Sequence, residues 1–196
     1  EVVPMQGWTR DMYFDQTGLP WVMPSPNMPT LETAVVYPGL CLLEGTNVSE
    51  GRGTTRPFEI SGAPWATPSL MADLPREMGL QGVVFRPVHF IPTFQKWAGE
   101  LLGGVQIHVT DRTSFRPFRT GLALVMAYRE AGLENFRWKN PPYEYEYQKM
   151  PFDILAGNGK VRADIEQGRT LDQIEASWRE ELEEFRIKRL EYLLYD

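Results

Sequence analysis

"GVQIHVTDRTSFRPFRTGLALVMAYREAG", residues 104–132, joins a strand pattern to a helix pattern. Apolar and polar residues alternate at its start, so the three apolar residues between 105 and 109 fall on one strand face. Pro117 suits a first helical turn, and apolar residues then share one face of a helix expected over residues 115–130. A strand with one polar face followed by an amphipathic helix indicates an α+β domain.

The sequence before residue 104 predicts further strands and helices. A second strand is expected at residues 83–91, and a helix at 68–79 that begins after a proline. Residues 31–43 read either as a helix capped by Thr30 or as a buried strand, because periodicity does not separate the two. The first 30 residues are rich in prolines and aromatics, which predicts a short strand followed by a structured loop.

The most regular pattern lies near the C-terminus. Thr170 and Gln173 form a capping box, and a smaller helix is expected before it at residues 158–167. Apolar residues then recur at spacings of three and four: Leu171, Ile174, Trp178, Leu182, Phe185 and Leu193. The chain therefore predicts a single α+β domain, with a mixed or antiparallel sheet flanked by helices and a long C-terminal amphipathic helix.

Composition argues against several classes of protein. The 196 residues are 42% hydrophobic and 23% charged, which is typical of a globular domain. The net charge of −6 provides no overall basic surface for nucleic acid, and no apolar run is long enough for a membrane span. One cysteine and two histidines on different expected strands make a poor metal-ligand set. We therefore expect no metal, no cofactor, no nucleic-acid partner and no membrane span.

Charged and hydrogen-bonding side chains are most concentrated in a glycine-rich stretch, "EGTNVSEGRGTTRPFE" at residues 44–59. It lacks the spacing of a phosphate-binding loop or a dinucleotide fingerprint. Its glycines permit a close approach to the backbone, and its acids, hydroxyls, amides and arginines match a polyhydroxylated or carboxylated ligand. The alternative is internal, with Glu50 and Glu59 pairing with Arg52 and Arg56 to hold the shape of the loop. Both interpretations remain open from the sequence.

Four stretches resemble one bacterial protein family. They are "PSPNMPT" (residues 24–30), "YPGLCLLEGTNVSEGRGTTRPFEISGAPW" (37–65), "FRPVHFIPTFQKWAGELLGGVQIHVTDRTSFRPFRTGLAL" (85–124) and the ending "YLLY". The family was long described as a domain of unknown function and is now associated with exo-acting β-N-acetylmuramidases of the NamZ type, which trim peptidoglycan fragments. The resemblance covers essentially the whole chain, and residues 44–59 are its most specific part.

Members of this family look like two-domain proteins, with a Rossmann-like N-terminal domain before an α+β domain. The resemblance implies that residues 1–196 are a single C-terminal domain, and the strand-like opening Glu1-Val2-Val3 also predicts a longer polypeptide. The active site is expected between the domains, with the main catalytic glutamate in the N-terminal one. This chain alone is therefore expected to be inactive. Glu50 is the candidate for an assisting acid.

The function implied by the resemblance is hydrolysis of non-reducing terminal β-linked N-acetylmuramic acid in peptidoglycan fragments. The alternative is a non-catalytic peptidoglycan- or sugar-binding module. The implied partners are the protein's own N-terminal domain and a muropeptide or other sugar containing muramic acid, and the implied location is the cell envelope. The candidate substrate-binding residues are Asn27, Asn47, Glu50, Arg52, Thr54, Arg56, Gln106 and His108.

Overall fold

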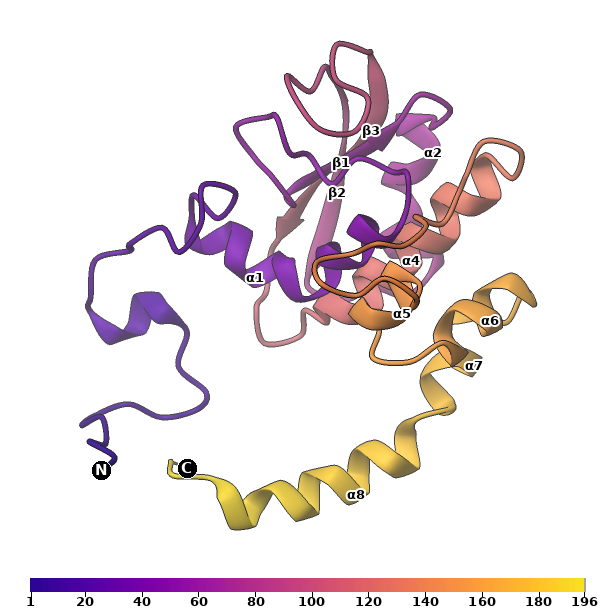
Figure 1. The fold of residues 1–196 in the computed structure, drawn as a ribbon. Coiled ribbons are helices and arrows are strands. Elements are labelled where there is room, and N and C mark those ends of the chain that lie inside the picture. Colours follow the sequence, from indigo (N-terminus) through magenta and orange to yellow (C-terminus); the bar gives the residue numbers. More distant parts are fainter. Residues whose placement is uncertain (196) are drawn as a thin grey trace.

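The computed structural model describes residues 1–195, in which a three-stranded antiparallel sheet of order β1-β3-β2 packs against helices (Figure 1). The strands are β1 (Ile60–Ala63), β2 (Val83–Phe90) and β3 (Leu102–Val109). The helices are α1 (Leu31–Leu40), α2 (Pro68–Ala72), α3 (Leu74–Glu77), α4 (Pro117–Ala131), α5 (Pro151–Leu155), α6 (Lys160–Glu166), α7 (Leu171–Ala176) and α8 (Arg179–Arg189). Short 3₁₀ helices span Phe14–Thr17, Cys41–Gly45 and Leu190–Tyr192. The predicted α+β class is confirmed.

The alternation predicted for β3 is confirmed by its two faces. Val105 and Ile107 are buried in the core against α1 and α4, whereas His108 is exposed. In the antiparallel register, Gln106 lies opposite Arg86 of β2, and their side chains share a hydrogen bond of 2.5 Å. The outer face of the sheet is thus polar around Gln106 and His108, as the alternation requires.

Helices α1 and α4 cross with their backbones in contact. A Cβ atom added at Gly121 of α4 would lie 2.1 Å from the Gly39 carbonyl oxygen of α1. A Cβ atom added at Gly39 would lie 1.8 Å from the carbonyl oxygen of Pro117. Only glycine allows this separation, because any side chain would occupy the position of the neighbouring backbone.

The helical interpretation of residues 31–43 is confirmed for its greater part. The Thr30 hydroxyl accepts a hydrogen bond from the Thr33 amide at 3.3 Å, which is the predicted N-cap. The helix expected over 68–79 is instead two short helices, α2 and α3. Pro75 explains the interruption, because it lacks the amide hydrogen that a continuous helix would bond to the carbonyl of Met71.

The short strand predicted within residues 1–30 is wrong. This segment contains only a 3₁₀ helix and otherwise extends away from the sheet (Figure 1). Its first residues contact the C-terminus, where the Met5 amide donates to the Tyr195 hydroxyl at 2.7 Å. Without a neighbouring strand edge, an apolar run such as Val2-Val3 cannot form a ladder. The four-residue strand β1 was missed, because "ISGA" has too short a pattern.

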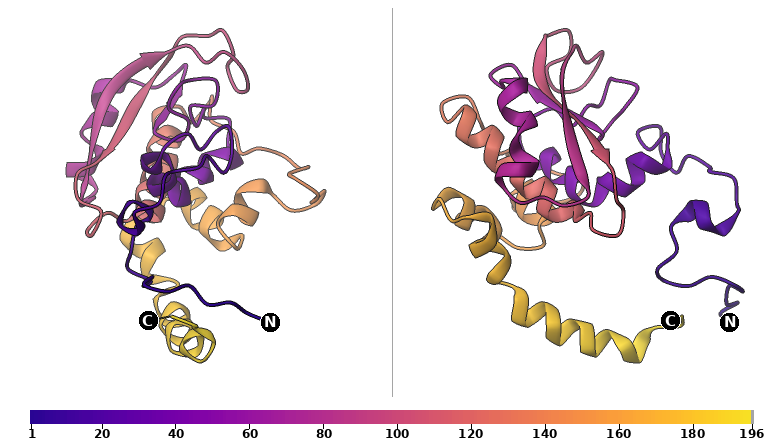
Figure 2. Two further views of the ribbon diagram at one scale, coloured as in Figure 1. Left: turned by 90° about the vertical axis from the view of Figure 1, so that its left-hand side faces the viewer. Right: turned by 180° about the vertical axis from the view of Figure 1, so that it is seen from behind.

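The C-terminal amphipathic helix is present but interrupted. Thr170 and Gln173 form the predicted capping box, and Leu171 and Ile174 are buried. The helix breaks at Ser177 and Trp178, and α8 then turns away from the body of the molecule (Figure 2). Only the first half of the predicted apolar stripe is therefore buried by this chain.

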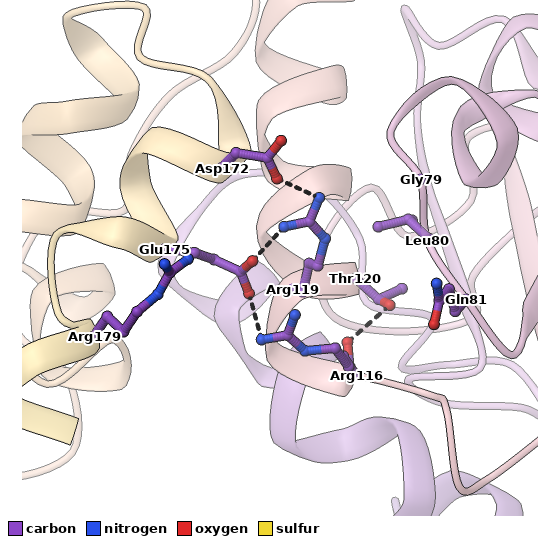
Figure 3. Close-up of a pocket in the computed structure, with 9 residues that line it drawn as sticks. All are labelled: Gly79, Leu80, Gln81, Arg116, Arg119, Thr120, Asp172, Glu175 and Arg179. Carbon is purple, nitrogen blue, oxygen red and sulfur yellow. Dashed lines mark hydrogen bonds and ion pairs between the residues drawn. The ribbon is translucent and has the colours of Figure 1, made fainter. Parts of the chain in front are cut away.

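Arg119 joins α4 to the C-terminal helices, at the pocket of Figure 3. It donates to Glu175 and to Asp172 (2.7 Å) of α7, and to the Met78 carbonyl at 3.2 Å. The side chains of Arg119 and Glu175 are only 13% and 14% exposed. Breaking this ion pair leaves the shielded Glu175 carboxylate with Arg116, a 65% exposed side chain at 2.9 Å, as its remaining partner, which makes Arg119 a stability determinant.

Arg119→Ala is expected to lower the free energy of unfolding by about 2 kcal/mol, because Glu175 loses its shielded partner and keeps only the exposed Arg116. Urea denaturation measures the change. The control is Arg186→Ala, since Arg186 pairs with Glu183 on an exposed helix face and should contribute less than about 1 kcal/mol. Equal losses in the two variants would show that the Arg119 network does not stabilise the contact between α4 and α7.

Candidate functional site

The glycine-rich stretch, residues 44–59, folds as a compact loop between the 3₁₀ helix Cys41–Gly45 and β1. Gly51 and Gly53 adopt φ angles of +77° and +81°. A Cβ atom at Gly53 would lie 2.7 Å from backbone atoms of Phe94, and one at Gly51 would lie 2.4 Å from the Ile60 carbonyl oxygen. The space beside these glycines is therefore filled by the protein's own backbone.

Three residues of this loop form a cluster of charged and polar side chains with two residues from other loops, and we call it the Glu50 cluster: Glu44, Glu50, Arg52, Lys96 and Tyr143. Arg52 bonds Glu44 at 2.7 Å and Glu50 at 3.2 Å. Burial lowers the pKa of Arg52, but its hydrogen bond to Glu44 and the two carboxylate charges raise that pKa above its usual value. Arg52 therefore stays charged while bridging two largely buried acids.

Lys96 is the most heavily bonded member of the Glu50 cluster. Its ammonium donates to Glu50 at 2.8 Å and to the carbonyls of Leu43 (2.9 Å) and Val48 (3.0 Å). An ammonium has three donors, so all of them are used. Burial lowers the pKa of Lys96, and the charge of Glu50 opposes that effect.

The backbone around Lys96 is strained. Its two neighbours, Gln95 and Trp97, have φ angles of 69° and 60°, a region that costs a non-glycine residue roughly 1–3 kcal/mol. The Trp97 indole donates to the Asn47 carbonyl at 2.6 Å, which holds the loop over residues 91–101 against the glycine-rich stretch. The strain is thus offset by contacts that place the Lys96 ammonium beside Glu50.

Tyr143 completes the Glu50 cluster from a distant loop. Its hydroxyl donates to Glu44 at 2.7 Å. Burial raises the pKa of Tyr143, and the hydrogen bond with the Glu44 carboxylate raises it further. The hydroxyl therefore remains protonated and acts as a donor at neutral pH.

A second acid-base pair holds the end of the glycine-rich stretch. Glu59 accepts hydrogen bonds from Thr33 at 2.6 Å and from Arg56 at 3.4 Å. Together with the Arg52–Glu50 pair, this contact confirms both ion pairs of the internal alternative. The two arginines differ in access, because the Arg56 side chain is 45% exposed whereas that of Arg52 is 25% exposed.

Two other candidates of this stretch are engaged in its own hydrogen bonds. The Asn47 side chain accepts from the Arg137 amide and donates to the Asn135 carbonyl, both at 2.9 Å. The Thr54 hydroxyl donates to the Gly51 carbonyl at 2.6 Å. These bonds fix the stretch, and Arg56 is its most exposed candidate.

The remaining candidates lie elsewhere. His108 and Glu59 line a cavity of about 180 Å³ beside α1, at the edge of β3 that β1 leaves unpaired, whereas Gln106 is bonded to Arg86 on the outer face of the sheet. Within residues 1–195, the Asn27 side chain makes no hydrogen bond, and the Asn27 backbone amide donates to the Ser25 hydroxyl at 3.3 Å. The structure therefore gathers five candidates on one loop and His108 near its end, but it does not join Asn27 to them.

Lys96 and Tyr143 were missed by sequence reasoning. Lys96 lies 46 residues from Glu50, and Tyr143 lies 99 residues from Glu44. No spacing rule connects positions so far apart, because chain folding alone brings them together. Neither residue lies in the polar stretch, residues 44–59, that the sequence analysis selected as a candidate site.

The described part of the chain, residues 1–195, holds no group of three or more His, Cys, Asp or Glu side chains suited to a metal ion. No helix in the same range is long and apolar enough to cross a membrane. The thiol of Cys41 is partly buried, and burial raises its pKa to about 11. Cys41 is therefore a weak nucleophile at neutral pH.

Solved structures share this α+β architecture. One crystal structure of a DUF1343 family protein from Bacteroides fragilis is 27% identical, with a TM-score of 0.81 over 97% of this chain and 49% of that chain. A second DUF1343 family protein from the same organism is 28% identical, with a TM-score of 0.62 over 89% of this chain and 44% of that chain. The fold is therefore that of the DUF1343 class of proteins.

Family descriptions match nearly the whole chain. The description "Exo-beta-N-acetylmuramidase NamZ, C-terminal" matches residues 35–195, and the corresponding N-terminal description matches residues 1–32. The chain therefore belongs to the NamZ exo-β-N-acetylmuramidase family. A relative from Bacillus subtilis (strain 168), the peptidoglycan beta-N-acetylmuramidase NamZ, is 44% identical over 194 residues. The match covers 99% of this chain and 45% of that protein, so the chain spans about half the length of its relatives.

Proposed function

We propose that this chain forms one wall of the sugar-binding cleft of an exo-β-N-acetylmuramidase. The substrate is the non-reducing terminal β-linked N-acetylmuramic acid of a peptidoglycan fragment. Membership of the NamZ family supports the reaction class. The observation that carries the role of this chain is Arg56, whose guanidinium is held by the buried Glu59 on one side and remains 45% exposed. A guanidinium presents forked donors that fit the lactyl carboxylate of muramic acid.

The second wall of the cleft is proposed to be an N-terminal domain of the same family. Most glycosidases act with two carboxyl groups about 5–9.5 Å apart, and family resemblance assigns the main one to that domain. This chain alone would then be inactive. Because Glu50 is only 5% exposed and bonds Arg52 and Lys96, its proposed role is to shape the cleft and not to act as the assisting acid.

The other candidate residues take supporting roles in this proposal. Asn47 and Thr54 hold the loop that presents Arg56, and Arg52 anchors that loop through the Glu50 cluster. His108 borders the cavity beside Glu59 and is proposed to contact a bound sugar from there. Gln106 and Asn27 are proposed as outer contacts of a longer fragment.

The reaction is tested with a chromogenic β-muramide. The two-domain protein, meaning this chain preceded by the family's N-terminal domain, is expected to release the chromophore, and the isolated chain is not. A two-domain protein that is inert but binds muropeptides would instead make this a binding module. The proposal also includes a cell-envelope location, which a gene without a secretion or lipoprotein signal in roughly its first 30 codons would contradict.

Arg56→Ala in the two-domain protein is expected to weaken binding of N-acetylmuramic acid by about 10-fold or more, the usual loss for a hydrogen bond to a charged group. Binding of N-acetylglucosamine, which lacks the lactyl carboxylate, should change little. Isothermal titration with both sugars measures the difference. The melting temperature should fall less than in an Arg52 variant, because Arg56 is 45% exposed and Glu59 keeps its hydrogen bonds from Thr30 and Thr33.

Arg52→Ala is the matched comparison. Arg52 is committed to Glu44 and Glu50, so its loss should lower the melting temperature by several degrees and affect both sugars alike. If the Arg56 variant also binds both sugars equally more weakly, Arg56 does not recognise the carboxylate. The reverse result, with muramic-acid selectivity lost only in the Arg52 variant, would assign that role to Arg52.

A further inference from the structure

Helix α8 is the least covered element of the molecule. No residue of α8 is buried, and the helix projects from the body after the break at Trp178 (Figure 1). Phe185 is 58% exposed and Leu190, at the end of the helix, is 65% exposed. An isolated helix of this length is marginal in water, so a helix with these apolar side chains gains stability from a covering surface.

An apolar groove of about 360 Å³ runs between α8 and the body of the molecule. Leu182 and Phe185 of α8 face residues of α4, α6 and the segment between α5 and α6 across it. The main apolar lining residues are Phe118, Ala156, Val161, Trp178, Leu182 and Phe185. Charged residues flank the apolar positions along α8, which is the arrangement of a protein interface with a polar rim.

The start of the chain indicates what covers this groove. Residues 1–32 match the family's N-terminal domain, and they too leave the body with exposed apolar side chains such as Val3 and Val22. The Trp8 ring contacts the Tyr195 ring edge-on at 5.1 Å, and Arg10 donates to the Tyr195 carbonyl at 3.0 Å. The segment that belongs to that domain therefore reaches the C-terminal end of α8 (Figure 2).

We propose that the groove face of α8 is the docking surface for the family's N-terminal domain. The N-terminal domain, whose family description residues 1–32 match, would lie beside Tyr195 and extend along α8 into the groove. Leu182 and Phe185 are 41% and 58% exposed in this chain, so covering them there would remove apolar surface from water and favour association. The inference rests on the two-domain arrangement of the proposed function, and it names the surface that holds the two walls of the cleft together.

Hydrogen exchange measured by mass spectrometry tests the docking directly. The amides of α8 are expected to exchange at least about 100-fold more slowly in the two-domain protein than in the isolated chain. The amides of α4, which lies in the core, provide the internal reference and should change little. Equal exchange of α8 in the two proteins would overturn the proposal.

Phe185→Asp provides a second test. It should lower the melting temperature of the two-domain protein by several degrees and change that of the isolated chain much less, because Phe185 is 58% exposed in this chain. Glu184→Ala, on the opposite side of the same helix, should change neither protein. A Phe185→Asp variant that destabilises both proteins equally would show that Phe185 packs within this chain and would refute the docking surface.

Two further outcomes separate the alternatives. If the isolated chain forms dimers by light scattering and α8 is protected only in them, a second copy occupies the groove and the proposal is wrong. Muramidase activity, measured on the same two-domain samples, distinguishes docking from function. Activity with an unprotected α8 refutes the docking alone, whereas a protected α8 in an inert protein refutes the proposed function alone.

Discussion

Replacing Lys96 with methionine is expected to lower the free energy of unfolding by about 3–5 kcal/mol. Methionine keeps an unbranched apolar stem but removes the ammonium, which bonds Glu50 and the carbonyls of Leu43 and Val48. Both carbonyls lose a donor, and the buried Glu50 carboxylate retains only Arg52. For a chain of this size the loss corresponds to roughly 10 °C in melting temperature, measured by calorimetry or circular dichroism.

The control for Lys96 is Lys149→Met, an exposed lysine whose replacement should change stability by less than about 0.5 kcal/mol. The double variant Lys96→Met with Glu50→Gln provides a sharper test. Removing the carboxylate charge along with its partner should restore part of the lost stability, because the uncompensated buried charge disappears. A Lys96 variant as stable as the Lys149 variant would show that the Glu50 cluster does not hold the loop.

Gly121→Ala is expected to destabilise the protein by about 3 kcal/mol or more, although alanine is the better helix former. The added Cβ atom would lie 2.1 Å from the Gly39 carbonyl oxygen, so α1 and α4 must separate. The obstacle is backbone and cannot rotate away as a side chain could. Because both helices contribute to the main core, their separation also loosens residues such as Leu122. Urea denaturation measures the loss.

Glu130→Ala, an exposed substitution near the end of α4, is the control for Gly121 and should be nearly neutral. The sign of the Gly121 result is diagnostic. Helix propensity alone predicts a gain of about 1 kcal/mol for alanine, whereas the backbone contact predicts a large loss. A Gly121→Ala variant that is more stable than the parent would show that the helices cross at a greater distance.

The sequence predicted the residue types of the candidate site but not which of its side chains pair. The residue types of the glycine-rich stretch predicted a polar loop, but they left ligand binding and internal pairing both open. Internal ion pairs are now seen for Arg52 and for Arg56, and Arg56 retains the larger exposed fraction. Lys96 was not predicted, since its position beside Glu50 depends on a loop folded back with left-handed residues on either side.

The sequence by itself determined those features that depend on neighbours a few residues away. The alternation of β3, the caps at Thr30 and Thr170 and the approximate extent of α4 all follow from local spacing and capping, and the structure has each of them. The family was also readable, because a specific run such as residues 44–59 is a property of the sequence alone.

Only the tertiary structure decided which charges meet, where the long C-terminal helix breaks and which half of its apolar stripe is covered. Glu44 meets Tyr143 across 99 residues, and Trp178 ends the covered half by packing edge-on against Phe118. Local sequence propensity predicts neither the contact between Glu44 and Tyr143 nor the break at Trp178. An ion pair or a buried face depends on surfaces from distant parts of the chain, and their positions follow from the packing of the whole domain.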